Sequence, residues 1–136
     1  MNIANLPILY YCDKKTGHSC KCSGIATRRI RLKNRHEKDM PNAVSEWGYR
    51  CEEHAITPTA KRVVVESIPY NQWHIVTEIN LFLSILVGKN IQSKIHRYQH
   101  LRVKYVKPNT GGVMCFQEKT NKWKFVYYNQ ISTVLS

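Results

Sequence analysis

The cysteines of this chain are concentrated in two short stretches, and that placement constrains its fold more than any other feature of the sequence. Three of the five cysteines lie in YYCDKKTGHSCKCSG, residues 10–24, and a fourth lies in WGYRCEEHA, residues 47–55. Each stretch also contains a histidine, His18 or His54. Cysteines that merely fill a hydrophobic core have no reason to gather beside histidines in this way. We therefore expect the fold to bring the two stretches together into one site.

The rest of the sequence favours metal ligands over disulfides at these positions. No basic residue precedes the apolar residues at the N-terminus and no small-residue cleavage site follows them, so we expect no secretory signal. The longest apolar run, Leu81–Val87, is far shorter than the ~20 residues that a membrane helix needs. We expect a cytoplasmic protein, and in that reducing compartment clustered cysteines bind metals more often than they form disulfides.

The spacing of these residues is that of zinc ligands, which usually come as two pairs on tight turns. Two residues separate Cys51 from His54, so both side chains can reach one ion from a single turn of chain. The other half is less regular, because Cys12, Cys20 and Cys22 offer three different pairs for two places. Four protein ligands leave no position open for water or substrate, so we expect a structural zinc that also contributes folding free energy.

The segments CSGIATRR and WGYRCEEHA resemble parts of small zinc modules of the treble-clef or zinc-ribbon type. In such modules a cysteine shortly precedes an Ala-Thr-basic strand, and a C-x2-H pair opens a short helix. The resemblance covers about residues 10–56 and implies that Cys22, Cys51 and His54 are ligands, with Cys12 as the fourth. The usual short first knuckle is replaced here by a longer, cysteine-rich loop, so Cys20 is an alternative to Cys22.

The Pro-Thr-containing segment ITPTAK, residues 56–61, separates the cysteine-rich part from the rest, and we place a soft domain boundary there. We expect residues 1–58 to form the zinc-binding module and residues 59–136 to form a basic α+β domain, unless both pack as one unit. The predicted fold class is therefore α+β. It combines an N-terminal zinc-stapled β-rich module with a C-terminal strand, two helices and an antiparallel β-meander.

Two helices are predicted in the second part. In NQWHIVTEINLFLSILV, residues 71–87, apolar residues recur at spacings of one, three and four, and Gly88 is a plausible stop. In KNIQSKIHRYQ, residues 89–99, Ile91 and Ile95 fall on one helical face and predict a second, shorter helix. Two helices followed by a hairpin are also compatible with a winged helix-turn-helix reader of DNA. The apolar positions of the first helix are Ile75, Val76, Ile79, Phe82, Leu83 and Leu86.

The sequence after these helices predicts strands. LRVKYVK, residues 101–107, alternates apolar and basic residues, and GVMCFQE and KWKFVYY flank the turn sequence KTNK as a hairpin. Cys115 in this hairpin is expected to be a core thiol. Trp123, Phe125 and Tyr127 alternate along the second hairpin strand, and we expect them to face the core, as such alternating aromatic residues usually do. Stacking on unpaired bases is the alternative, and it would require these rings to be exposed.

The charge of the chain indicates the kind of partner it meets. There are 21 lysines and arginines against nine acids, a formal net charge of +12. Nucleic acid is the commonest polyanionic partner of such a protein, and an acidic protein surface is the alternative. Basic residues are dense in TRRIRLKNR, and no acid lies between Ile79 and Gln117. The residues that we expect at a nucleic-acid interface are Arg28, Arg29, Arg31, Lys33, Arg35, Lys94, Arg97, Arg102 and Lys104.

We expect no enzymatic activity. The order His36, Asn42, Cys51, His54 is similar to that of the His-Asn-His nucleases, but His36 lies in a charged loop and His54 is better used on zinc. Paired carboxylates and a glycine-rich phosphate loop do not stand out in the sequence. The expected function is a non-enzymatic, zinc-containing protein that binds nucleic acid or a nucleic-acid machine, as a transcription regulator does. The alternative is a small interaction module or inhibitor that occupies an acidic or DNA-binding surface of another protein.

Overall fold

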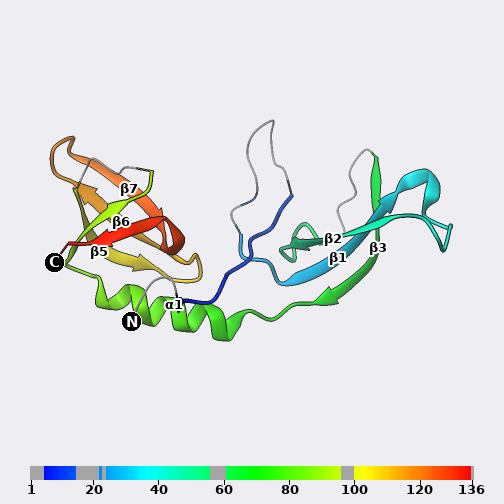
Figure 1. Cartoon of the computed structure of the whole chain (residues 1–136), viewed down its shortest axis with the longest axis horizontal. Coiled ribbons are helices and arrows are strands. Elements are labelled where there is room, and N and C mark those ends of the chain that lie inside the picture. Colours follow the sequence, from blue (N-terminus) through cyan, green and yellow to red (C-terminus); the bar gives the residue numbers. More distant parts are fainter. Residues whose placement is uncertain (1–4, 15–21, 23, 56–60, 96–99, 136) are drawn as a thin grey trace. The chain divides into compact units, whose positions relative to one another are not determined.

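The chain divides into two compact units in the computed structural model (Figure 1). Tyr10–Gln72 form one, here called the N-terminal unit, and Trp73–Ser136 with Met1–Leu9 form the other, the C-terminal unit. The predicted domain boundary falls mostly on residues 56–60, which lie outside the described residues. The structure describes residues 5–14, 22, 24–55, 61–95 and 100–135.

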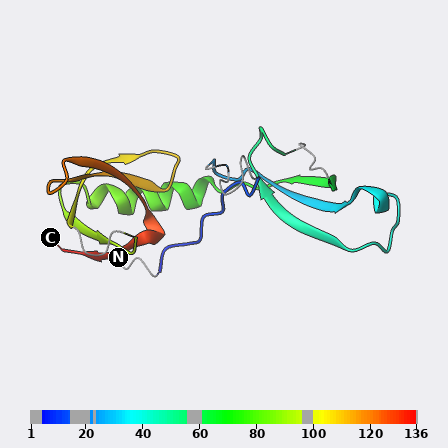
Figure 2. The ribbon, with the colours of Figure 1, turned by 90° about the horizontal axis from the view of Figure 1, so that it is seen from above.

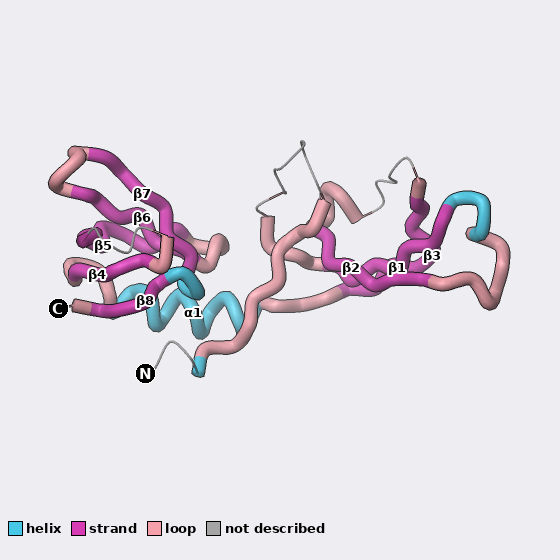
Figure 3. The backbone as a smooth tube through the Cα atoms, turned by 45° about the horizontal axis from the view of Figure 1, so that its top comes forward, coloured by secondary structure: helices cyan, strands magenta, loops and turns pink. Residues whose placement is uncertain are grey.

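The N-terminal unit contains a three-stranded antiparallel sheet in the order β2-β1-β3. β1 is the central strand, and the short 3-10 turn η2 (Arg35–Glu37) follows it on the way to β2, as the tube in Figure 3 shows. The expectation of a β-rich module in this part of the chain agrees with its three strands. Their bounds are Arg28–Asn34 for β1, Ser45–Arg50 for β2 and Arg62–Pro69 for β3.

A buried glutamine joins the segment that carries Cys12 to the start of β1. The amide nitrogen of Gln72 donates to the carbonyl oxygens of Tyr10 and Ala26, both at 2.8 Å, and its oxygen accepts from the backbone nitrogen of Tyr10 at 2.9 Å. A buried amide is costly unless its hydrogen bonds are made, and these three bonds use both ends of the side chain. The glutamine therefore fixes where the cysteine-bearing segment lies against the sheet.

The C-terminal unit consists of α1 (Trp73–Ile85) and a five-stranded antiparallel sheet in the order β7-β6-β5-β4-β8. The last strand pairs with the first, because the 3-10 turn η3 (Tyr128–Gln130) returns the chain from β7 to the edge of β4. The strands are β4 (Asn90–Ser93), β5 (His100–Lys107), β6 (Gly112–Gln117), β7 (Lys122–Tyr127) and β8 (Ile131–Val134).

The core of this unit lies between α1 and one face of the sheet, with α1 in contact with β5 and β6 (Figure 2). The predicted helical stripe is confirmed, since its apolar positions are buried except for Ile75, which is half-buried. In the described residues no helix is both long enough and apolar enough to cross a membrane. The strands contribute Ile91, Leu101, Val103, Val113, Cys115, Val126 and Ile131 to this core.

The second predicted helix is wrong, and with it the winged-helix interpretation. Asn90–Ser93 form β4, in which Ile91 and Ser93 are buried and their neighbours are half-buried, an alternation of period two. Gly88 adopts a φ of 87° and ends the helical region, and its nitrogen donates to the carbonyl of Val103 in β5 at 2.8 Å. Ile95, which completed the helical pattern in the sequence, is exposed. The described chain is α+β with one helix and two antiparallel sheets.

The aromatic residues of β7 also lie on the side opposite to the one expected. Val126 is fully buried against Val113 of β6, so the core side of β7 is formed by its even-numbered positions. Trp123, at an odd-numbered position, is 53% exposed. The alternation of aromatic and other residues along β7 is present as predicted. Which of its two sides faces α1 is set by the pairing of Val113 with Val126, because a shift of one residue in register would exchange the two faces of the strand.

The packing of α1 predicts different effects for two apolar residues on its opposite sides. Ile79→Ala removes a side chain with no solvent exposure and should lower the free energy of unfolding by about 2–4 kcal/mol. Leu81→Ala, at a position that is 63% exposed, is the matched control and should change it by less than about 0.5 kcal/mol. Urea unfolding followed by circular dichroism measures both. Equal effects of the two substitutions would contradict the orientation of the helix.

Candidate metal centre

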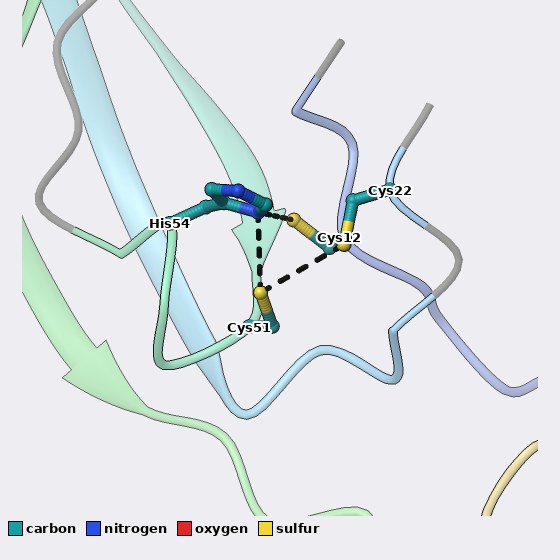
Figure 4. A group of neighbouring side chains, drawn as sticks. All are labelled: Cys12, Cys22, Cys51 and His54. Atoms are coloured by element: carbon teal, nitrogen blue, oxygen red, sulfur yellow. Dashed lines mark hydrogen bonds between the residues drawn. The ribbon is translucent and has the colours of Figure 1, made fainter. Parts of the chain in front are cut away.

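Four side chains of the N-terminal unit converge in the structure: Cys12, Cys22, Cys51 and His54. Their ligand atoms all lie within 4.8 Å of one another (Figure 4). Nδ1 of His54 is 3.3 Å from Sγ of Cys51 and 3.5 Å from Sγ of Cys12, and the Sγ atoms of Cys22 and Cys51 are 3.9 Å apart. Two segments that are distant in sequence thus supply one group that could hold a metal ion.

Three of the separations between these atoms are close to those of a tetrahedral site, and none of the others exceeds 4.8 Å. Bonds of about 2.3 Å to sulfur and about 2.0–2.1 Å to nitrogen place two sulfurs about 3.8 Å apart, and a sulfur and a nitrogen about 3.6 Å apart. The separations of 3.9, 3.3 and 3.5 Å differ from these values by a few tenths of an ångström. One ion could therefore be bound by all four atoms with small adjustments of the side chains.

Backbone hydrogen bonds hold the two loops that carry the ligands. The nitrogen of Cys12 donates to the carbonyl of Gly24 at 2.8 Å, and the nitrogen of Cys22 donates to the carbonyl of Lys14 at 2.9 Å. The nitrogen of Gly24 also lies 3.4 Å from Sγ of Cys22, the geometry of an N–H donor to a thiolate. In the other loop the nitrogen of His54 donates to the carbonyl of Cys51 at 3.2 Å, which closes the two-residue turn predicted from the sequence.

An ion pair beside the ligands joins the two halves of the site. Nε of Arg50, a buried side chain, lies 2.7 Å from Oδ1 of Asp13, and Oδ2 of Asp13 accepts from the backbone nitrogen of Tyr49 at 3.0 Å. Arg50 also donates to the carbonyl of His54 at 3.3 Å. A Cβ at Gly48 would lie 2.7 Å from Oδ2 of Asp13, so the glycine leaves room for the carboxylate. Each charged residue is adjacent in sequence to a cysteine ligand, and our sequence reasoning missed both.

The thiol of Cys51 is protonated at neutral pH unless a cation is bound. Burial, with a further contribution from the neighbouring thiols of Cys12 and Cys22, raises the pKa of Cys51 to about 11. A bound metal ion reverses this preference, because a coordinating thiol loses its proton. Cys115 is different: it lies alone in the core of the other unit, as predicted, and burial raises its pKa to about 12.

The arginines and lysine predicted on β1 are largely engaged within their own unit. Nε of Arg28 donates to Oγ of Ser67 at 2.9 Å, and Arg31 forms an ion pair with Glu66 at 2.9 Å. Nζ of Lys33, a buried side chain, donates to the carbonyl of Met40 at 2.8 Å. The guanidinium of Arg29 lies over the rings of Trp47 and Tyr49 at 5.2 and 5.3 Å.

The remaining predicted site residues have different positions. Arg35 is exposed in η2, and Lys94 is exposed just after β4. Arg102 and Lys104 lie on β5 of the C-terminal unit. Cys20 and Arg97 fall outside the described residues, so the structure describes Cys22 alone of the two alternative ligands.

Comparisons with known proteins give no family for the chain: no family model, no curated protein and no solved structure matches it significantly. The resemblance to treble-clef modules therefore rests on the sequence segments alone. Glu52 to Ala55, where such a module would open its helix, form a turn, and residues 56–60 are outside the described residues.

The centre predicts unequal effects of replacing two cysteines, one inside the group and one outside it. Cys51→Ser should abolish the binding of one metal ion per chain and unfold the N-terminal unit, because the removed thiolate is one of four ligands. Cys115→Ser, the matched control, should retain the ion while losing about 1–3 kcal/mol of stability through its buried hydroxyl. Native mass spectrometry reports the ion and its mass, and thermal melting reports unfolding. Retention of the ion by Cys51→Ser would contradict the assignment.

Proposed function

We propose that this protein is a zinc-stabilised, non-enzymatic protein that binds nucleic acid. Three thiols and one imidazole within 4.8 Å of one another are a donor set typical of structural zinc sites, and zinc has no geometric preference that this set would violate. Because all four positions would be filled by the protein, the ion has no open position for a substrate or a water. Its role in this proposal is to hold the fold of the N-terminal unit.

The distribution of ion pairs supports a nucleic-acid partner for the other unit. In the N-terminal unit Arg31, Arg50 and Arg62 are paired with carboxylates at 2.7–2.9 Å. In the described residues of the C-terminal unit, no lysine or arginine forms such a pair. The positive charge of these described residues is therefore not paired with carboxylates of the same unit, as is expected of a surface that binds a polyanion.

The observation that carries the proposal is this unpaired positive charge around β5. Residues 73–136 contain only two acids, Glu78 and Glu118. Lys104 and Lys107 on β5 are exposed, and Arg102 on the same strand is half-buried. Phosphate contacts of this kind supply most of the affinity in non-specific nucleic-acid binding. The basic residues between positions 73 and 136 are Lys89, Lys94, Arg97, Arg102, Lys104, Lys107, Lys119, Lys122 and Lys124.

The salt dependence of binding tests the proposal. Affinity for mixed-sequence DNA or RNA, measured by fluorescence anisotropy, should fall steeply as salt rises. The double variant Lys104→Ala/Lys107→Ala should bind more weakly and reduce the slope of log K against log salt by about 2. Lys38→Ala, an exposed lysine of the N-terminal unit, is the control and should leave the slope unchanged.

The alternative function predicts a different result in the same experiment. An interaction module that targets an acidic protein would show little affinity for free nucleic acid at any salt concentration. Affinity purification with and without nuclease would then recover the same protein partner in both samples. That outcome, or an affinity for DNA and RNA that does not depend on salt, would refute nucleic-acid binding.

A further inference from the structure

The sheet face of the C-terminal unit that points away from α1 carries five aromatic side chains. Cross-strand partners project from the same face, and on this face Arg102 lies opposite Phe116, and Phe116 opposite Trp123. The next row joins Tyr105, Met114 and Phe125. We call this surface of β5, β6 and β7 the aromatic face. Its rings are those of Tyr105, Phe116, Trp123, Phe125 and Tyr127.

The rings of the aromatic face are accessible. Trp123 is 53% exposed and Tyr105 is 49% exposed, while the other three rings are half-buried. A cluster of large apolar side chains on the surface of a folded protein usually marks a binding site. The aromatic face therefore requires an explanation beyond the packing of the unit.

The rings contact one another at an angle rather than face to face. Trp123 lies 5.4 Å from Phe116 at an interplanar angle of 63°, and 6.2 Å from Tyr105 at 51°. Phe125 and Tyr127 are 4.7 Å apart at 85°. None of these three pairs is stacked face to face, so ring surfaces are left for another flat group. A Cβ at Gly112 would collide with the ring of Phe125, so this glycine makes room for that ring on the face.

Positive charges surround these rings. Arg102, Lys104 and Lys107 lie on β5, and Nζ of Lys107 is 5.7 Å from the centre of the Phe125 ring. β5, β6 and β7 contain no acidic residue. Lys119 and Lys122 add positive charge where β6 turns into β7, beside the single acid Glu118. Exposed aromatic rings among cations are the combination with which proteins hold unpaired bases and their phosphates.

A cavity of about 300 Å³ adjoins the row of Arg102 and Phe116, and these two residues help to line it. Gln117, another lining residue, is 1% exposed. Its Oε1 accepts from Oγ1 of Thr120 at 2.7 Å, while its Nε2 has no hydrogen-bond partner among the described residues. Asn90 contributes a second amide to the lining. The cavity thus combines an aromatic ring, a guanidinium and the amide of Asn90, which can hydrogen-bond to the edge of a base. His100, Lys119 and the acid Glu118 also line it.

We propose that the aromatic face binds single-stranded nucleic acid. Unpaired bases stack on Trp123 and Tyr105, and the cations of β5 contact the phosphates. In a duplex the bases are stacked on one another, so its phosphates would meet the cations while the rings stayed uncovered. This inference rests on the proposed function, to which it adds the strand state of the ligand and the residues that contact the bases.

The test compares single-stranded and duplex ligands with the full chain. Labelled oligo(dT) and oligo(U) of about 12 nucleotides should bind more tightly than a mixed-sequence duplex of the same length. Trp123→Ala should weaken binding of the single strands by about 5- to 150-fold, the range reported by removal of one stacking contact. Trp47→Ala, which removes an exposed tryptophan of β2, is the matched control and should leave the affinity unchanged.

A conservative variant separates stacking from folding. Trp123→Phe keeps an aromatic ring, so it should retain most of the affinity for single strands, whereas the quenching of tryptophan fluorescence by oligo(U) should largely disappear. Equal affinity for duplex and single strands, with no effect of Trp123→Ala, would overturn the inference and leave nucleic-acid binding in place. Absence of binding to every oligonucleotide at low salt would overturn both.

Discussion

The N-terminal unit depends on the convergence of three thiols and one imidazole. Among its described residues the buried apolar side chains are few and mostly small, and Ile30 and Leu32 are the largest of them. A core of this size contributes little of the free energy needed to order some 60 residues. A metal ion bound by Cys12, Cys22, Cys51 and His54 would contribute directly to folding, because the unfolded chain has no such site. The ion pair between Asp13 and the buried Arg50 is consistent with this role, since it joins the two segments that carry these residues.

The C-terminal unit is stabilised differently. Its helix and sheet enclose a continuous set of buried aliphatic residues, which includes Ile79, Leu83, Leu101, Val103 and Val126. Because this core is supplied by one face of the sheet, the opposite face is free to carry aromatic rings and cations that folding does not require. On this account the two units have different roles: a bound ion would stabilise the N-terminal unit, and the C-terminal unit presents the surface that we propose for the ligand.

The grouping of Cys12, Cys22, Cys51 and His54 could be predicted because its signal is local. The two-residue spacing between Cys51 and His54 is that of a zinc ligand pair, and the clustering of cysteines in residues 10–24 predicts that Cys12 and Cys22 belong to the same group. The stripe of α1 was predictable for the same reason, since a period of 3.6 residues is visible within one segment. The class α+β followed from the same patterns, although the number of helices did not.

The errors arose where pairing between distant segments decides the structure. Residues 89–95 fit a helical pattern, but Ile91 pairs with Leu101 and Val134, and these strand partners lie far from it in sequence. The direction of Trp123 depends on the register between β6 and β7, which alternation alone cannot supply. The Asp13–Arg50 pair joins residues 37 positions apart, and neither local sequence contains a pattern that predicts this pairing.

The most direct test of the account is a pair of two-dimensional amide NMR spectra of the full chain, recorded before and after removal of metal with a chelator. The account predicts that dispersed signals from residues 24–55 collapse on chelation and return when one equivalent of zinc is added. Signals from residues of α1 and β5 to β7 should persist throughout. An unchanged spectrum of the N-terminal unit in metal-free protein would contradict the central claim that a bound ion holds that unit together.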